Sequence, residues 1–356
     1  MNQITDAMDM VEHLRQPAFC VQDGTIVKVN AAASGRMIQP GTPVEQLLKT
    51  GTEEYRDFTD GCLFLSLNVC DQELGFSVSR KNGFDLFQLE QDAEGCELQA
   101  LALAARELRE PLASIMISAD HLFPADSDDP AAITQISRIN QGLFQMLRLI
   151  SNMSDAGRYA ASGSVSMEVK NISALFDEIV AKAAALVEHA GIQLEYSGIP
   201  EPVYGLVNPE LLERAVLNII SNALKFTPNG GFIRAKAQRR GNKLYLSILD
   251  SGTGIPESAR NNLFSRHTRE PGLEDGRFGI GLGFVIIRSA AQQHGGTVLV
   301  DHPADSGTRV TMTLAIRSGN ADQVRSPILR VDYAGERDHG LLELSDVLPS
   351  ELYNVQ

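Results

Sequence analysis

The spacing of apolar residues divides the chain into segments of different secondary structure. In the first ninety or so residues, short apolar or alternating runs occur at 17–21, 25–29, 62–69, 74–78 and 84–89; the run 17–21 is apolar and the run 25–29 alternates. Such runs are typical of β-strands, and the Asp23-Gly24 and Asn82-Gly83 pairs are hairpin turn signals. Residues 30–48 favour small helical segments between the two strand groups. We therefore expect a strand-rich domain over residues 1–91.

From Cys96 the apolar residues recur at alternating spacings of three and four, which is the seam of a coiled coil. The first seam contains Leu98, Leu101, Ala105, Leu108, Leu112, Ile115, Ala119 and Leu122, and the second contains Ile136, Ile139, Leu143, Met146, Ile150 and Met153. Pro111 should bend the first helix locally. The loop at 124–130 joins the two helices, so the pattern predicts an antiparallel hairpin over residues 92–160, with a linker at 157–166.

An isolated hairpin would leave its seam exposed to water. We therefore expect two copies to associate into a dimeric four-helix bundle, which makes the protein a homodimer. The alternative is a monomeric hairpin packed on a neighbouring domain of its own chain.

Helical and strand patterns mix in the next domain, over residues 165–316. Helices are predicted at 172–189, 209–225 and 283–294, and strands at 231–238, 244–250, 297–301 and 309–316. The last domain, 317–356, is a tail in which 328–333 and 341–344 could pair across the turn-prone segment 334–340. The whole chain is thus predicted to be an α+β multidomain protein.

The amino-acid composition limits the classes of function that the chain can have. With 356 residues, of which 43% are apolar, the chain can form several packed domains. The net charge of −14 argues against nucleic acid as a main partner. No run of apolar residues is long enough for a membrane span, and residues 1–10 do not read as a signal peptide, so we expect a cytoplasmic location. Four cysteines without a Cys-x-x-Cys motif should be free, buried thiols; they are Cys20, Cys62, Cys70 and Cys96.

Three segments of residues 165–316 carry candidate chemistry. In the first, Asn218 and Asn222 share one face of a predicted helix, where an amide oxygen can ligate Mg²⁺. Lys225 follows on the same helix and can reach a phosphate. In the second segment, Asp250 ends a predicted strand and can accept a hydrogen bond from an exocyclic amine.

The third segment is the glycine-rich run 276–283, directly before an apolar helix. Flexible backbone amides at a helix N-terminus favour phosphate binding. Each segment alone is weak evidence for a nucleotide-binding site, but all three segments in this order are strong evidence for one. The sequence contains no P-loop and no Rossmann fingerprint that would indicate a different kind of nucleotide site.

Together these segments resemble the N box and the two glycine boxes of the GHKL ATPases. The match to the sensor histidine-kinase branch extends through His294-Gly-Gly-Thr297 to Gly307-Thr308 and, with the hairpin, covers roughly residues 96–316. The resemblance implies a Bergerat-type α/β sandwich that binds ATP and Mg²⁺. The ATP-binding residues that it implies are Asn218, Asn222 (also the Mg²⁺ ligand), Lys225 (phosphates), Phe226 (near the base), Asp250 (adenine amine), Gly252, Gly254, Gly279, Gly281, Leu282, Gly283 and Thr308.

The first domain resembles a PAS sensor domain in its order of two strands, small helices and three strands. Another small α+β regulatory module is the alternative. Arg266, Arg269 and Arg277 lie before or within the glycine-rich run and are candidate phosphate contacts, or else simply solvated side chains of a lid.

Hydrolases of the superfamily place a glutamate four residues before the magnesium asparagine. Asn218 stands at that position here. By resemblance, an autonomous hydrolase is disfavoured and phosphoryl transfer to protein is favoured.

The acceptor motif of sensor kinases, His-Glu-Leu-Arg-Thr-Pro-Leu, aligns with residues 106–112, where Arg106 replaces the histidine and Glu110 the threonine. Arginine stays protonated above about pH 12, so it has no lone pair for attack on a phosphoryl group. We therefore predict no autophosphorylation at this position, and Glu107, which assists proton removal in the family, would be vestigial. His121 is a poor substitute because it lies about 22 Å further along the helix.

Two functions follow. The first is a signalling protein that binds Mg-ATP, lacks its own acceptor and acts through a response regulator or another kinase. The second is an active kinase that phosphorylates a histidine, serine or threonine of a partner protein. Arg106 could pair with phosphate or with Glu110, and the sequence does not choose between these.

Overall fold

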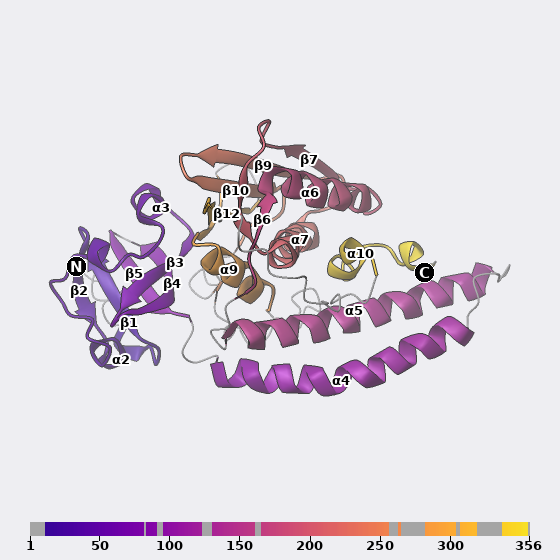
Figure 1. Ribbon diagram of the computed structural model, residues 1–356, viewed down its shortest axis with the longest axis horizontal. Coiled ribbons are helices and arrows are strands. Elements are labelled where there is room, and N and C mark those ends of the chain that lie inside the picture. Colours follow the sequence, from indigo (N-terminus) through magenta and orange to yellow (C-terminus); the bar gives the residue numbers. More distant parts are fainter. Residues whose placement is uncertain are drawn as a thin grey trace.

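A computed structural model describes residues 11–81, 83–90, 95–122, 130–160, 165–255, 263–264, 282–303, 307–318 and 337–354. Figure 1 shows the arrangement: a strand-rich unit at the N-terminal end, a long helical hairpin, and a mixed α/β unit beside both. The loop predicted at 124–130 lies almost wholly outside the described residues.

The N-terminal unit is an antiparallel sheet in the order β2-β1-β5-β4-β3. Its elements are β1 (Ala18–Gln22), β2 (Thr25–Val29), α2 (Ala31–Ser34), η1 (Val44–Gln46), α3 (Thr52–Asp57), β3 (Cys62–Val69), β4 (Gln72–Lys81) and β5 (Phe84–Leu89). The five strands predicted from these short runs are confirmed, with β4 longer than expected. Phe19, Phe76 and Phe87 pack ring against ring in its core.

The hairpin consists of α4 (Gly95–Leu122) and α5 (Pro130–Ala160), which pack along each other. The helix α4 continues through Pro111. The linker predicted at 157–166 is wrong in its first part, because α5 remains helical to Ala160. Gly157 suits this end of α5, since a Cβ there would lie 2.6 Å from the Leu98 carbonyl oxygen of α4.

Only half of each predicted seam is buried. On α4, Leu112 is 4% exposed while Leu108 is 49% exposed, and on α5, Leu143 is 5% exposed while Met146 is 44% exposed. Every second seam position therefore packs between the two helices. Of the alternate positions, Leu108, Ile115, Ile139 and Met146 are exposed, while Leu101 and Met153 are half-buried against a cluster that includes Leu282 and Val285.

The second α/β unit pairs its strands in the order β11-β12-β10-β9-β7. The strands are β7 (Gln193–Ser197), β9 (Phe232–Arg240), β10 (Lys243–Asp250), β11 (Val298–Asp301) and β12 (Arg309–Ala315), and the helices are α6 (Ile172–Glu188), α7 (Pro209–Phe226) and α9 (Gly283–Gln293). All the predicted helices and strands of this unit are present. The sequence reasoning missed β7 and the small sheet of β6 (Glu168–Asn171) and β8 (Tyr204–Val207).

The helices of this unit begin where side chains cap them. The Asn208 side chain accepts a hydrogen bond from the Leu211 backbone N–H at 2.8 Å, and Pro209 occupies the first turn of α7. The Asn171 side chain caps α6 in the same way. Asparagine at the N-cap and proline in the first turn both favour a helix start.

The two sheets join into one of ten strands, because β3 of the first pairs antiparallel with β11 of the second. Phe64 pairs with Val298, and Leu63 with Leu299. Glu54 of α3 also binds Lys243 and Tyr245 of β10, each at 2.8 Å. The N-terminal unit is thus attached to the edge of the second sheet (Figure 1).

The C-terminal segment forms α10 (His339–Glu343) and the short helix η3 (Ser350–Tyr353) against α5 and α7. The prediction of a strand at 341–344 is wrong. The Asp338 side chain caps the helix by accepting from the Leu341 N–H at 2.8 Å, and Leu342 and Leu344 are fully buried. The proposed pairing partner, 328–333, lies outside the described residues.

Two of the three described cysteines are free and buried, as predicted, and the third is exposed. Cys20 and Cys62 are free and buried, and burial raises the pKa of the Cys20 thiol to about 11. Cys70 is free but exposed, because it occupies the tight β3–β4 turn with a positive φ of 52°. The side chain of Cys96 lies outside the described residues. Within the described ranges, no helix combines the length and apolar character needed to cross a bilayer.

Candidate functional site

The N-box side chains line one face of α7. Asn218 is 2% exposed, and its amide nitrogen donates to the Arg214 carbonyl oxygen at 2.8 Å. Asn222, one turn later, is half-buried, as are Lys225 and Phe226 near the end of the helix. From Asn218 to Phe226 the helix rises about 12 Å. This face can therefore contact an extended ligand at two separate ends.

The first end is closed by the start of α9. A Cβ on Gly283 would lie 3.1 Å from Asn218 Oδ1 and 3.9 Å from Asn222 Nδ2, so the α9 backbone approaches the two asparagines closely. Leu282, the N-cap residue, is buried and provides no side-chain cap. The first backbone N–H groups of α9 therefore lie beside the Asn218–Asn222 face, where an anion would be favoured.

The second end is formed by Asp250, the last residue of β10. Its Oδ1 accepts hydrogen bonds from the backbone N–H groups of Gly252 at 2.8 Å and Thr308 at 3.0 Å. A Cβ on Gly252 would come within 2.5 Å of the Phe226 carbonyl oxygen, which places the Asp250 turn against the end of α7. A side chain at Gly307 would collide with Asp250 itself.

The carboxylate of Asp250 is 5% exposed. Burial raises its pKa, and the hydrogen bonds from Thr308 and Gly252 oppose that shift. Within the described residues Oδ2 accepts no hydrogen bond, so it is the oxygen left for a ligand donor. Gly254, further along the turn, has a φ of 76°, a backbone conformation that glycine adopts without strain.

The structure thus brings together the predicted site residues of α7, of the Asp250 turn, and Leu282, Gly283 and Thr308. Gly279, Gly281 and the arginines Arg266, Arg269 and Arg277 lie outside the described residues. Phe264 is described; it is buried and packs against Phe64 and Phe284.

The predicted acceptor position lies on α4. Arg106, Glu107 and Glu110 are all exposed there, and α5 lies between α4 and the second α/β unit in Figure 1.

A buried charge cluster beside Asn218 was not found by sequence reasoning. Arg214 of α7 and Arg148 of α5 are 0% and 5% exposed, and both bind the fully buried Glu343 of α10, at 3.0 and 3.2 Å. Arg148 also donates to Ser221 Oγ at 3.1 Å. The one signal available was the position of Arg214, an arginine four residues before Asn218 in an apolar helix pattern.

Comparison with known proteins agrees with this geometry. Residues 207–318 match the profile of the histidine kinase-, DNA gyrase B- and HSP90-like ATPases. The chain is 25% identical over 259 residues to hybrid signal transduction histidine kinase D of Dictyostelium discoideum, covering 70% of this chain and 17% of that protein. It is 28% identical over 250 residues to adaptive-response sensory kinase SasA of Crocosphaera subtropica, covering 65% of this chain and 64% of that protein.

Among solved structures, full-length ShkA in complex with AMPPNP matches with a TM-score of 0.50 and 21% identity, over 63% of this chain and 47% of that chain. This match concerns the fold alone. The chain spans less than two thirds of the length of these curated relatives.

The fold and the site define an ATPase domain of the histidine kinase, gyrase and HSP90 type, which is an ATP-binding domain. Residues 207–318 belong to this ATPase family, and the chain is similar to sensor histidine kinases over 250 to 259 residues.

Proposed function

We propose that the chain is a dimeric sensor-kinase-like protein that binds Mg-ATP but does not phosphorylate itself at the usual position. The observation that carries this proposal is the combination of an assembled α7–Asp250–α9 site with Arg106 at the acceptor position. A guanidinium keeps its proton at neutral pH, so it cannot attack the γ-phosphoryl group.

The donor set at the site suits Mg-ATP. Asp250 Oδ2 is positioned to accept from the adenine amine, and Phe226 lies beside the same turn. The start of α9 beside Asn218 and Asn222 suits phosphates, as does the cationic Lys225 further along α7, and the Asn222 amide oxygen suits a hard cation such as Mg²⁺. Among the described residues no group of three His, Cys, Asp or Glu could hold a metal. We therefore expect Mg²⁺ to enter with the nucleotide phosphates, whose oxygens would complete its ligand set.

The exposed halves of the two seams support a dimer through the hairpin. Leu108 and Ile115 of α4 and Met146 of α5 are between 44% and 53% exposed. These side chains repeat at coiled-coil spacing, so a second copy would bury them in a four-helix bundle.

We further propose that the N-terminal sheet is a PAS-like input domain. The structure has two early strands, then small helices, then three later antiparallel strands. This is the order on which the prediction rests. Its attachment to β11 gives it a direct route to the ATP-binding unit. Output would pass to a response regulator or another kinase.

The test is phosphorylation with γ-labelled ATP in four variants of the full chain. We expect no label in the wild type or in Arg106→Lys, which keeps the positive charge, and acid-labile label in Arg106→His. The double variant Arg106→His/Asp250→Asn should lose that label because the adenine contact is gone. Label on wild-type α4 would contradict the proposal.

The second candidate function is transfer to a histidine, serine or threonine of a partner protein. The observation that favours it is that Arg106 does not alter the nucleotide site, which lies on α7 and the Asp250 turn. Incubation of the wild type with labelled ATP and candidate partners distinguishes the two functions. Acid-labile label on the partner indicates histidine, and acid-stable label indicates a hydroxyl group.

A further inference from the structure

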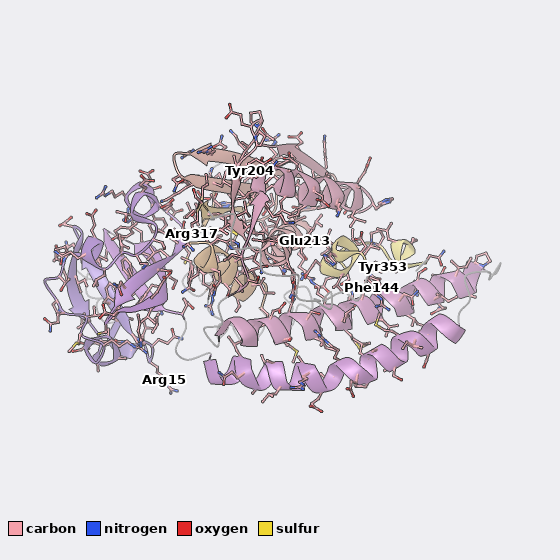
Figure 2. The ribbon with its side chains drawn as sticks, viewed as in Figure 1. Arg15, Phe144, Tyr204, Glu213, Arg317 and Tyr353 are labelled. Carbon is pink, nitrogen blue, oxygen red and sulfur yellow. The ribbon has the colours of Figure 1, made fainter. Side chains whose placement is uncertain are left out.

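The C-terminal segment, residues 337–354, docks on α5 and α7 through specific contacts. Side chains of α5 donate to its backbone carbonyl oxygens: Asn140 to Tyr353 at 3.0 Å, and Gln141 to Ser345 and Leu348 at 3.0 and 2.8 Å. Tyr353 also packs its ring on Phe144 of α5, with centroids 5.2 Å apart. Figure 2 shows these two side chains meeting between α5 and the C-terminal segment.

Two carboxylates of this segment contact the N box itself. Glu343 accepts from Asn218 Nδ2 at 3.2 Å, in addition to binding both buried arginines. Asp346 lies 3.0 Å from Lys225 Nζ and 2.5 Å from Arg148 Nη1. The segment therefore engages both Asn218 and Lys225, at the two ends of the N box.

Three cationic side chains lie where the C-terminal segment contacts α5 and α7, and they need anionic partners. Arg148, Arg214 and Lys225 are buried side chains with at most 10% exposure. Leaving such cations without partners is strongly unfavourable. The described contacts supply carboxylates from Glu343 and Asp346, and Arg214 also pairs with Asp155. Phosphate oxygens are chemically equivalent partners for these cations.

Lys225 cannot pair favourably with a carboxylate of the C-terminal segment and with a nucleotide phosphate at the same time. The phosphate loses its lysine partner and gains a like charge nearby, which is unfavourable. We propose that the docked C-terminal segment competes, through Asp346 and Glu343, with nucleotide phosphates for the N box. Nucleotide binding then loosens the segment from α5. This inference rests on the proposed function, because it assumes that the α7 face binds Mg-ATP.

The test compares nucleotide affinity in matched variants of the full chain. Asp346→Asn removes the charge beside Lys225 and should bind Mg-ATP at least about fivefold more tightly than the wild type. Glu351→Gln is the control: it removes one charge from the same segment at an exposed position of η3. Its affinity should equal that of the wild type. Asp346 is chosen over the fully buried Glu343, whose replacement could prevent folding.

Hydrogen exchange gives a second readout. Saturating Mg-ATP should speed amide exchange in residues 339–353 of the wild type while slowing exchange around Asp250. Unchanged affinity in Asp346→Asn, together with an equally protected segment when nucleotide is bound, would overturn the competition and leave the proposed function standing. Binding in Asp346→Asn but not in the wild type would support the competition strongly. Absence of binding in every variant would remove the proposed function and the competition together.

Discussion

At the scale of single residues, small side chains permit the closest approaches in this molecule. Gly157 of α5 lies against Ala102 and Leu98 of α4, where an added Cβ would be only 2.6 Å from the Leu98 carbonyl oxygen. Gly142, on the same helix, has no atom within 4 Å of such a Cβ. The two glycines of α5 therefore have opposite expected responses to substitution.

We predict that Gly157→Ala destabilises the protein by about 1–3 kcal/mol, because the clash involves backbone and forces the helices apart. Gly142→Ala should instead be neutral or stabilise by about 0.5–1 kcal/mol, because alanine is the better helix former. Urea unfolding followed by far-UV circular dichroism, with all variants at one protein concentration, measures both. Equal effects in the two variants would contradict the close packing at Gly157.

At the scale of secondary structure elements, His294 connects the end of α9 to the start of α7. Its Nδ1 lies 2.6 Å from the Ala290 carbonyl oxygen, and its Nε2 accepts from the Asn208 N–H at 3.0 Å. A carbonyl only accepts, so Nδ1 carries the proton and the ring is neutral. Burial lowers the pKa of His294 to about 4. Because Asn208 caps α7, this ring supports the helix that carries the N box.

The sign of the resulting pH dependence follows from that lowered pKa. The stabilisation from His294 is complete above the unfolded pKa of 6.5 and is lost as the pH falls toward 4, because the unfolded chain takes up the proton first. We predict a loss of about 2 kcal/mol between pH 7.5 and pH 5 from this residue.

The measurement is urea unfolding of the wild type and His294→Gln at both pH values. Glutamine does not titrate, so the variant should be less stable at pH 7.5 but should lose less stability on acidification. Parallel pH dependences in the two proteins would show that His294 does not titrate as predicted.

At the scale of the whole molecule, the ten-stranded sheet makes the N-terminal unit and the ATP-binding unit continuous. The junction consists of the β3–β11 ladder and the contacts of Glu54, whose side chain is 8% exposed, with Lys243 and Tyr245. Glu54 also helps to raise the pKa of Tyr245, after the larger effect of burial. A change at this junction would be transmitted directly between the N-terminal unit and the ATP-binding unit.

We predict that Glu54→Gln weakens the junction by about 1–3 kcal/mol, because charged hydrogen bonds are lost in a partly buried place. Amide exchange of residues 62–64 and 298–300 should accelerate. Glu53→Gln is the matched control, since that side chain is 74% exposed and 3.6 Å from Lys243. Unchanged exchange in Glu54→Gln would mean that the strand ladder alone holds the two units together.

Local patterns in the sequence were sufficient for most elements. Short, largely apolar runs predicted β3 and β5 at their observed bounds, and the caps Asn171 and Asn208 explain why α6 and α7 begin where expected. The tail was misread because three leucines in the short run 341–344 fit a strand as well as a helix. Only the packing of Leu342 and Leu344 on the core selects the helix.

The sequence by itself determined which side chains the α7 face and the Asp250 turn carry and that an arginine stands at position 106, because those depend on which residues are present and on their spacing along single helices and turns. Only the tertiary structure decided that β3 pairs with β11 and that Glu343 and Asp346 reach the N box. Those contacts join residues more than 100 positions apart, and no local periodicity or motif specifies a pairing at such a distance.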